Sequence, residues 1–407
     1  MKSRNKVIVE YDRNMKLTEQ IQLKSTPELS RLCHLSKNLY NEALFQYRQF
    51  FFKLQEFINY YDLQIILKDK ECYKQLPAQT SQQIIDLAMR NWKSYWAASK
   101  EYKRNPSKFL GRPKMPKYKE KDGESIVIFT NQNTRIKDGY IHFPEKCNLK
   151  PIKTRIEKYQ QIRIIPMKNY YKMEIIYNIQ KVDLGLNRNN CLGIDLGLKN
   201  LITAVNNNGL KPFVVKGGIT KSLNQFYNKT NTFLQSNKDK QKYEFQTKNQ
   251  LKLLRKRNNS IHDQFHKISR HIVNYCVKND IGTIVIGYNQ EWKQNINIGK
   301  KNNQNFVQIP FDKLIHQIRY KSEIVGINVI LNEESYTSKC SFLDNETVEK
   351  HEIYCGKRIK RGLFRSSNGR IINSDVNGAY NILKKAIPNS FENGIEALVL
   401  EPYSVIM

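Results

Sequence analysis

The stretch Cys191-Leu-Gly-Ile-Asp-Leu-Gly197 decides how the second half of this chain folds. It has the pattern of a buried β-strand that carries one acid, Asp195, between two aliphatic residues. An unpaired carboxylate is costly to bury, so Asp195 needs a cation, a metal ion or water beside it. The flanking glycines, Gly193 and Gly197, allow another backbone to approach closely. The alternative is an acid at a strand end that caps a neighbouring element.

The segments after this stretch predict an α/β domain. Two strand-like segments follow at once, joined by the turn sequence Asn206-Asn-Asn-Gly. Helical and strand-like patterns then alternate to the end of the chain. The predicted strands are 200–205, 212–215, 283–287 and 327–332, and the predicted helices are 220–279, 310–325 and one that opens at Ser374. A three-stranded meander followed by alternating helices and strands is typical of a domain of the ribonuclease H type.

The first half has a different pattern. Residues 6–11 alternate like a strand, and helical periodicity runs from Thr26 to about residue 100. Residues 124–180 read as short strands separated by turns. We expect these strands and the first one to close a small barrel or sheet, with the helices inserted between its first and second strands. The polar segment 181–190 marks the main boundary.

The charge of the chain predicts a polyanionic partner. Its 407 residues include 68 Lys and Arg against 37 Asp and Glu, a formal net charge of +31. Nucleic acid is the usual partner of such an excess. With 40% hydrophobic residues the chain is too apolar for a disordered tail, and no run is long enough for a membrane span or a signal peptide. Its seven scattered cysteines favour a reducing compartment, so we expect a cytoplasmic protein without a membrane partner.

One basic segment stands out as a candidate nucleic-acid contact. Residues 100–121 hold nine Lys and Arg, with interleaved aromatics, and proline and glycine break any helix there. Such a loop suits contact with phosphates and bases, although a solvated linker has the same composition. The candidate residues are Lys103, Arg104, Lys108, Arg112, Lys114, Lys117 and Lys119.

Asp375 is the second candidate acid. It opens a predicted helix, where an acid alone is most often an ordinary N-cap. Together with Asp195, it would supply the few carboxylates that Mg²⁺ prefers, and a two-ion site would act on a phosphodiester. A third acid is expected from an adjacent strand, but the natural position is Gly287. The acids that remain are Glu291, Glu333 and Glu334, and the strand pattern alone does not choose between the last two.

Five motifs resemble the TnpB family, over nearly the whole chain. They are 193–200 (GIDLGLKN), 375–382 (DVNGAYNI), 336–340 (YTSKC), 111–119 (GRPKMPKYK) and 34–44 (HLSKNLYNEAL). TnpB proteins are RNA-guided DNA nucleases of insertion sequences, related to compact type V CRISPR effectors and to Fanzor proteins. The resemblance implies a RuvC-like site of Asp195, Glu334 and Asp375 that uses Mg²⁺, with guide RNA and double-stranded DNA as partners.

The chain departs from the family pattern in two places. The second-motif glutamate is replaced by Gly287, but some family members carry a relocated glutamate before the Thr-Ser-Lys segment, where Glu334 stands. The zinc ribbon is eroded, since only Cys340, His351 and Cys355 lie in the insertion. A structural zinc ion normally has four ligands, so we expect none here. The basic insertion would instead contact nucleic acid, or be a solvated loop.

The resemblance also implies a domain plan. The expected parts are a wedge-like β-barrel domain (1–25 and 122–182), a helical recognition lobe (26–121), a RuvC-like nuclease domain (183–336 and 371–390), an insertion (337–370) and a C-terminal tail (391–407). The expected activity is cleavage of double-stranded DNA beside a short adjacent motif, directed by guide RNA. The alternatives are a nuclease-dead RNA-guided repressor, which Gly287 motivates, and a DNA transposase.

Overall fold

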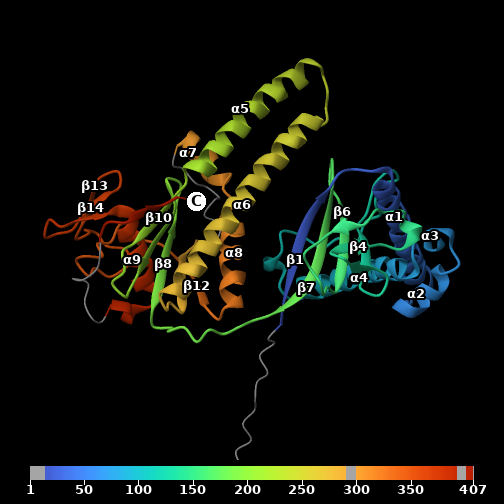
Figure 1. Cartoon of the computed structure of the whole chain (residues 1–407), viewed down its shortest axis with the longest axis horizontal. Helices are drawn as coiled ribbons and strands as arrows, with labels where there is room; N and C mark the ends of the chain where they lie inside the picture. Colours follow the sequence, from blue (N-terminus) through green and yellow to red (C-terminus); the bar gives the residue numbers. More distant parts are fainter. Residues whose placement is uncertain (1–13, 290–298, 392–399, 407) are drawn as a thin grey trace, which may run out of the picture. The chain divides into compact units, whose positions relative to one another are not determined.

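Two compact units make up the chain, one from Asn14 to Ile179 and one from Gln180 onward (Figure 1). We call them the N-terminal and the C-terminal unit. The computed structural model describes residues 14–289, 299–391 and 400–406. No helix among these residues has the length and hydrophobicity that crossing a membrane requires. The strand predicted at 6–11 lies outside the described residues.

The helices of the N-terminal unit lie between its first and second strands, as predicted. They are α1 (Pro27–Gln49), α2 (Tyr60–Leu67), α3 (Glu71–Lys74) and α4 (Ala78–Arg104), with a short π-helix (Phe50–Leu54) after α1. Thr26 caps α1 by accepting a hydrogen bond from the backbone N–H of Leu29. The apolar faces of α1 and α4 pack together, and Trp92 of α4 stacks on Tyr47 of α1 with ring centroids 4.6 Å apart.

The described strands of the N-terminal unit form two separate sheets. The larger sheet has the order β1-β7-β6-β2, and the smaller has the order β3-β4-β5. The bounds are β1 (Asn14–Leu23), β2 (Val127–Thr130), β3 (Arg135–Lys137), β4 (Tyr140–His142), β5 (Ile152–Lys153), β6 (Gln161–Pro166) and β7 (Tyr171–Gln180). A closed barrel is therefore not confirmed. Strand β1 was missed because its alternation of exposed and half-buried residues carries few large aliphatics.

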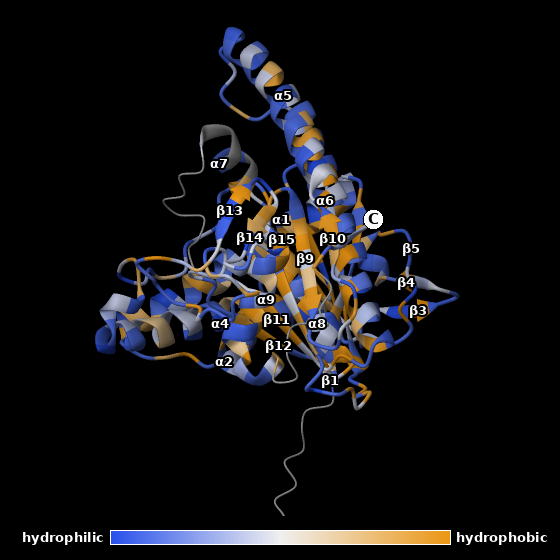
Figure 2. Ribbon diagram, turned by 90° about the vertical axis from the view of Figure 1, so that its left-hand side faces the viewer, coloured by the Kyte–Doolittle hydropathy of each residue, from blue (hydrophilic) through white to orange (hydrophobic). Residues whose placement is uncertain are grey.

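A six-stranded sheet organises the C-terminal unit, in the order β12-β11-β8-β9-β10-β16. Its strands are β8 (Cys191–Leu196), β9 (Asn200–Asn206), β10 (Phe213–Lys216), β11 (Thr283–Gly287), β12 (Asn328–Asn332) and β16 (Tyr403–Val405). Strands β8, β9 and β10 form the predicted antiparallel meander, and β11 and β12 run parallel to β8. These central strands are among the most hydrophobic segments of the chain (Figure 2).

Helices cover both faces of this sheet. One face packs on α6 (Lys248–Lys278) and α8 (Phe311–Ile324) through a core that includes Phe265, Ile268 and Leu314. The other face packs on α9 (Ser374–Ala386), where Val205 and Val285 meet that helix. A Cβ atom at Gly193 would lie 2.8 Å from the backbone oxygen of Ala379. The glycine beside Asp195 thus allows α9 to approach β8 closely, as its position in the motif predicted.

Three parts of the C-terminal unit differ from the sequence prediction. The stretch 220–279 is two helices, α5 (Gly218–Lys240) and α6, which form a projecting hairpin (Figure 1). Thr247 and Gln250 close a capping box that starts α6. The insertion is not wholly irregular, since β13 (Lys357–Lys360), β14 (Leu363–Arg365) and β15 (Ile371–Asn373) form a small sheet. Part of the expected tail is β16, which pairs in parallel with β10.

Candidate functional site

Asp195 lies near the end of β8 and is half buried. Strand β9 pairs with it through Thr203, and helix α9 covers it from the other side. A Cβ atom at Gly378 of α9 would be 3.5 Å from the Asp195 carboxylate oxygen Oδ2. Burial, followed by the charges of Glu334 and Asp375, raises the pKa of Asp195 well above its usual value. The acid is thus in electrostatic contact with both other acids predicted for the site.

Asp375 is the second residue of α9, but it does not cap that helix. The cap is Asn373, whose side-chain oxygen accepts hydrogen bonds from the backbone N–H groups of Asp375 and Val376, at 3.0 and 3.3 Å. The side chain of Asp375 instead accepts a hydrogen bond from Nδ2 of Asn200 at 2.8 Å. The ordinary N-cap interpretation of Asp375 is therefore wrong, and its carboxylate is directed to the strand that follows β8.

Glu334 and Glu333 have different environments. The Glu333 carboxylate forms an ion pair with Lys385 at 2.5 Å and accepts from the backbone N–H of Ser335 at 2.8 Å. These two interactions lower its pKa. The Glu334 carboxylate lies against Gly287, where a Cβ atom would be 2.8 Å from its Oε2. Glu334 thus occupies the space that a side chain at position 287 would need. The third candidate, Glu291, lies outside the described residues.

Asn289 holds Glu334 at two points. Its side-chain oxygen accepts from the backbone N–H of Glu334 at 3.0 Å, and its Nδ2 donates to Oε1 of Glu334 at 3.5 Å. Burial, with a smaller contribution from the neighbouring charge of Glu333, raises the pKa of Glu334 to about 7. A glutamate with this pKa at the end of a central sheet is a candidate functional residue on physical grounds.

The donor set of this site suits a hard divalent cation. Carboxylate oxygens are the ligands that Mg²⁺ prefers, and a cation beside Asp195 would offset both its burial and the repulsion from the charges of Glu334 and Asp375. Within the described part of the chain, no three His, Cys, Asp or Glu side chains stand close enough to share one ion. The contacts of Asp375 are one reason that the three acids do not form such a cluster. Asn200 donates a hydrogen bond to one of its carboxylate oxygens, and Arg358 lies 3.7 Å from the other.

Sequence reasoning missed Asn200, Asn289 and Arg358. Asn200 lies inside the 193–200 motif and also accepts from Nζ of Lys216 at 3.2 Å, so the motif contained a usable signal. Arg358 comes from β13 of the insertion, and its guanidinium also donates to Oγ of Ser374 at 2.8 Å. Its approach to the site depends on how the insertion folds back onto α9, which no local pattern shows.

The predicted nucleic-acid residues lie in the N-terminal unit, in two kinds of place. Lys103 and Arg104 occupy the last turn of α4, and Lys108 pairs with Glu101 at 2.7 Å. Arg112, Lys114, Lys117 and Lys119 follow in an extended segment. The structure brings Lys114, Lys117 and Lys119 together along one groove against α4. Their contact with nucleic acid stays a prediction.

Within the insertion, the buried carboxylate of Glu346 joins two loops through hydrogen bonds. Oε2 of Glu346 accepts from the backbone N–H of Ser341 at 2.6 Å, and its Oε1 accepts from that of Cys355 at 3.0 Å. Cys340 donates from its thiol to the backbone oxygen of Glu349 at 3.5 Å, and His351 lies 2.8 Å from the backbone oxygen of Thr347. That the insertion binds no structural zinc stays a prediction.

Two family models match the chain. The first, OrfB_IS605, is described as "Probable transposase" and matches residues 174–293, which include β8 and Asp195. The second is described as "Cas12f1-like, TNB domain" and matches residues 311–382, which include Glu334 and Asp375. This chain is a TnpB relative. The resemblance that the motifs predicted is confirmed.

Two curated relatives support the assignment. A TnpB-like protein, ORF457, from Acidianus two-tailed virus is 27% identical over 209 residues, which are 49% of this chain and 42% of that protein. The CRISPR-associated endodeoxyribonuclease Cas12f1 of Sulfoacidibacillus thermotolerans is 37% identical over 127 residues, which are 30% of this chain and 26% of that protein. This TnpB relative therefore aligns with less than half the length of each of these proteins.

A solved structure supports the fold. The protein chain in the "Cryo-EM structure of the Cas12f1-sgRNA-target DNA complex" superposes with a TM-score of 0.54 at 17% identity, and the match covers 87% of this chain and 81% of that one. The mixed α/β, multidomain fold class predicted from the sequence is thus confirmed for this TnpB relative.

Proposed function

We propose that this chain is an RNA-guided DNA endonuclease whose hydrolytic site is Asp195, Glu334 and Asp375, with Mg²⁺ as its metal. The observation that supports the proposal is that, after burial, the charges of Glu334 and Asp375, which come from separate segments, both raise the pKa of Asp195 near the end of β8. Such perturbed carboxylates mark functional sites. Similarity to a TnpB-like protein and to the endodeoxyribonuclease Cas12f1 supports a reaction of the phosphodiester hydrolysis class.

The three acids would hold the metal, and the residues around them would keep the acids in place. Bound Mg²⁺ would supply an activated water and neutralise charge on the leaving oxygen. Asn200 orients Asp375 through a 2.8 Å hydrogen bond, and Asn289 orients Glu334. Arg358 lies at the rim beside Asp375, where its guanidinium can bind a phosphate oxygen of the DNA backbone.

The partners in this proposal are a guide RNA and target double-stranded DNA. The net charge of +31 supports binding to polyanions, and the Cas12f1 chain whose structure superposes on this one is in a complex with sgRNA and target DNA. Pairing with the guide would read the DNA sequence, while the protein would read a short motif beside the target. The helical part 26–121 would be the recognition lobe, which contributes to the protein's part of this recognition.

A cleavage assay on matched variants tests the proposal. The protein is purified with its co-expressed RNA and incubated with Mg²⁺ and a plasmid library that has a fixed target and randomised flanks. We expect cleavage of guide-matched targets beside one flank, and its loss in Asp195→Ala and Glu334→Gln. Glu333→Gln is the matched control and should cleave, because Glu333 is bound to Lys385.

The other outcomes of the assay identify the alternatives. Cleavage that survives Glu334→Gln but not Asp195→Ala would assign the third acid to Glu333 or Glu291. Guide-matched binding without cleavage in the wild type would favour the nuclease-dead repressor that Gly287 motivates. Strand transfer without RNA would favour the transposase. The first result changes the third acid and keeps the reaction, whereas the other two replace the proposed reaction.

A further inference from the structure

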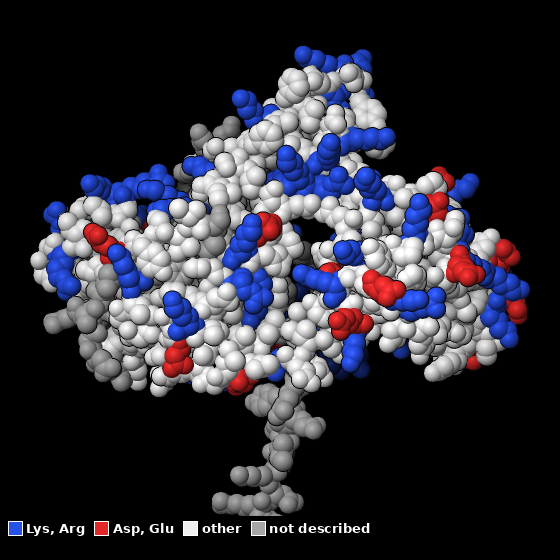
Figure 3. Space-filling model, viewed as in Figure 1, with Lys and Arg blue, Asp and Glu red and all other residues white. Residues whose placement is uncertain are grey.

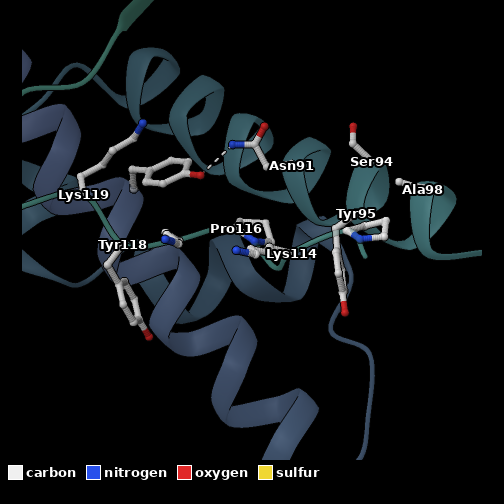
Figure 4. Close-up of a pocket in the computed structure, with 11 residues that line it drawn as sticks. Asn91, Ser94, Tyr95, Ala98, Lys114, Pro116, Tyr118 and Lys119 are labelled. Carbon is white, nitrogen blue, oxygen red and sulfur yellow. Dashed lines mark hydrogen bonds between the residues drawn. The ribbon is translucent and has the colours of Figure 1, made fainter. Parts of the chain in front are cut away.

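Two adjoining cavities in the N-terminal unit form one continuous groove along α4. The first has a volume of about 480 Å³ and lies between α4 and the extended segment 113–119 (Figure 4). The second, of about 400 Å³, shares Tyr40, Asn91 and Lys119 with the first and continues toward Ser125. We call this depression the α4 groove. Each cavity is in the size range of pockets that bind small organic groups.

The two walls of the groove differ in chemistry. One wall is a single face of α4, with Asn91, Ser94, Tyr95 and Ala98 at helical spacing (Figure 4). The other wall is the extended segment, which presents one lysine between two prolines and two more after the second proline. Lys114, Lys117 and Lys119 take part in no ion pair among the described residues, and all three side chains are exposed.

Helix α1 holds the extended wall in place. Asn41 accepts a hydrogen bond from the backbone N–H of Lys119 at 2.8 Å and donates to its backbone oxygen at 2.9 Å. Arg48 donates to the backbone oxygen of Pro116 at 2.5 Å, and its guanidinium lies 4.3 Å from the ring centre of Tyr118. The groove is therefore preorganised, which lowers the entropy cost of binding a ligand in it.

These groups match the parts of a nucleotide. Ammonium groups of the lysines bind phosphate oxygens. The half-buried Tyr95 ring, which packs against Trp92 and Trp96, also lines the groove, where an aromatic side chain can contact a base. Asn91 donates one N–H to the Tyr40 hydroxyl at 2.7 Å, which leaves its other N–H and its side-chain oxygen for the edge of a base. Ser94, which is exposed, adds a hydroxyl on the same face.

A concave site of this kind fits an unstacked base better than a duplex. Duplex DNA is read by side chains that project into its grooves, and a base reaches a pocket only after it is unpaired. RNA offers unstacked bases in loops and bulges, and proteins bind them by aromatic stacking and edge hydrogen bonds. We propose that the α4 groove binds one unstacked nucleotide of the guide RNA. This inference rests on the proposed function, because it assumes that guide RNA is the partner.

A pair of tryptophan substitutions tests the groove in the full chain. Ala98→Trp places an indole inside the groove, whereas Ala97→Trp places it one residue away on the exposed surface of α4 and is the matched control. The charge pair is Lys114→Gln, in the groove, against Lys100→Gln, outside it. Fluorescence anisotropy measures binding to a labelled 12-nucleotide single-stranded RNA and to a 20-base-pair DNA duplex, and melting temperatures check folding.

We expect Ala98→Trp to weaken RNA binding about tenfold, in line with the loss of one stacked base, and Ala97→Trp to change it less than twofold. Lys114→Gln should weaken RNA binding more than Lys100→Gln. Equal RNA affinity of Ala98→Trp and Ala97→Trp would overturn the inference. Weakened duplex binding with unchanged RNA binding would also overturn it and assign the groove to DNA. If Ala98→Trp does not fold, Tyr95→Leu and the lysine pair decide.

The test separates the groove from the activity. RNA affinity is measured without cleavage, so a wild type that binds RNA through the groove and cuts nothing would contradict only the proposed nuclease. A wild type that cuts guide-matched DNA while Ala98→Trp equals Ala97→Trp in RNA binding would contradict only the groove. In the purified complex, acylation of RNA 2′-hydroxyl groups should show one nucleotide that reacts in Ala98→Trp and is protected in Ala97→Trp.

Discussion

Gly287 and Glu334 occupy one space at the end of the central sheet. A Cβ atom at position 287 would lie 2.8 Å from Oε2 of Glu334 and 2.5 Å from Cδ1 of Ile382. No real Cβ atom approaches a neighbour this closely without displacing it. A side chain at position 287 and the Glu334 carboxylate in its present place are therefore alternatives.

We predict that Gly287→Ala lowers guide-directed cleavage at least tenfold while the protein stays folded. The added methyl group displaces the Glu334 carboxylate, and overpacking against Ile382 costs about 1–3 kcal/mol. Single-turnover cleavage rates and melting temperatures measure the two effects. Gly218→Ala is the control, because a Cβ atom there meets nothing within 4 Å. Wild-type cleavage in Gly287→Ala would show that Glu334 does not depend on the glycine.

We predict that Glu334→Gln stabilises the metal-free protein at pH 8. The pKa of Glu334 is about 7 in the folded protein against 4.5 for an ordinary glutamate, so folding favours its protonated form. The folded state consequently loses stability as pH rises from about 4.5 to 7, and the amide variant escapes this loss. At about 1.4 kcal/mol per pKa unit, the gain has a ceiling of about 3 kcal/mol.

Thermal unfolding in EDTA at pH 5 and pH 8 measures this gain. The difference between variant and wild type should be large at pH 8 and small at pH 5. Glu333→Gln is the opposite control, because Lys385 lowers the pKa of Glu333 and the loss of its charge brings no gain at pH 8. Equal melting temperatures of Glu334→Gln and wild type at pH 8 would mean that the site does not strain the metal-free fold.

At the scale of elements, the insertion is closed by a side chain in the region where the family pattern has a zinc ribbon. Glu346 is buried, and its two oxygens accept from the backbone on either side, next to Cys340 and at Cys355. Lys384 of α9 donates to the backbone oxygen of Glu346 at 3.0 Å. The carboxylate thus links two loops of the insertion to each other, and Lys384 links them to the helix that carries Asp375.

We predict that Glu346→Ala loosens the insertion without zinc being involved. Two backbone N–H groups lose a charged acceptor, which should cost roughly 2–4 kcal/mol of local stability. Hydrogen exchange over residues 337–373 measures this, with the exposed Glu352→Ala as control. A zinc chelator should leave the exchange of the wild type unchanged. Faster exchange with chelator would contradict the expectation that the insertion holds no zinc.

Sequence patterns predicted those elements whose signal is local. The strand around Asp195, the meander after it and the helix that begins before Asp375 each carry their own hydrophobic period, and the structure confirms all three. The sequence pattern did not separate Glu333 from Glu334, because both lie at one strand end and only their partners in the fold differ. Lys385, Gly287 and Asn289 come from other parts of the chain.

Long-range pairing explains the elements that the sequence did not predict. Strand β16 has three residues, too few to show a period, and it exists because β10 offers an open edge. Arg358 reaches Asp375 only because β13 folds back toward α9. The expected barrel likewise depends on which strands pair, and the described strands pair as two sheets. Local sequence patterns predict individual helices and strands, whereas strand pairing and long-range side-chain contacts depend on the whole fold.

At the scale of the whole molecule, charge is concentrated on one projecting element. Residues 218–278, which form the α5–α6 hairpin, hold 13 Lys and Arg against three acids, a net charge of +10 out of +31 for the chain. Lys and Arg side chains crowd this hairpin (Figure 3). Exposed rings lie among them, including Phe226 and Phe233 of α5 and Phe245 of the turn. The composition is that of a surface which follows a nucleic-acid backbone.

We predict that neutralising four hairpin lysines reduces the salt dependence of DNA binding. The variant changes Lys229, Lys240, Lys248 and Lys252 to Gln, all exposed. Each phosphate contact contributes about −0.9 to the slope of log K against log salt on duplex DNA, so four lost contacts flatten the slope by about 3–4. Anisotropy titrations of a DNA duplex between about 50 and 200 mM KCl give the slope.

A second variant with the same change in net charge distinguishes phosphate contacts made by the hairpin from a general effect of the net charge of the protein. It replaces Lys137, Lys150, Lys153 and Lys158, which are exposed in the N-terminal unit on and beside its small sheet, by Gln. If only net charge matters, the two variants flatten the slope equally, and the hairpin has no special part in binding. If the hairpin contacts the phosphates, its variant alone changes the slope. The comparison holds the charge constant, so the difference between the slopes counts the phosphates that the hairpin neutralises.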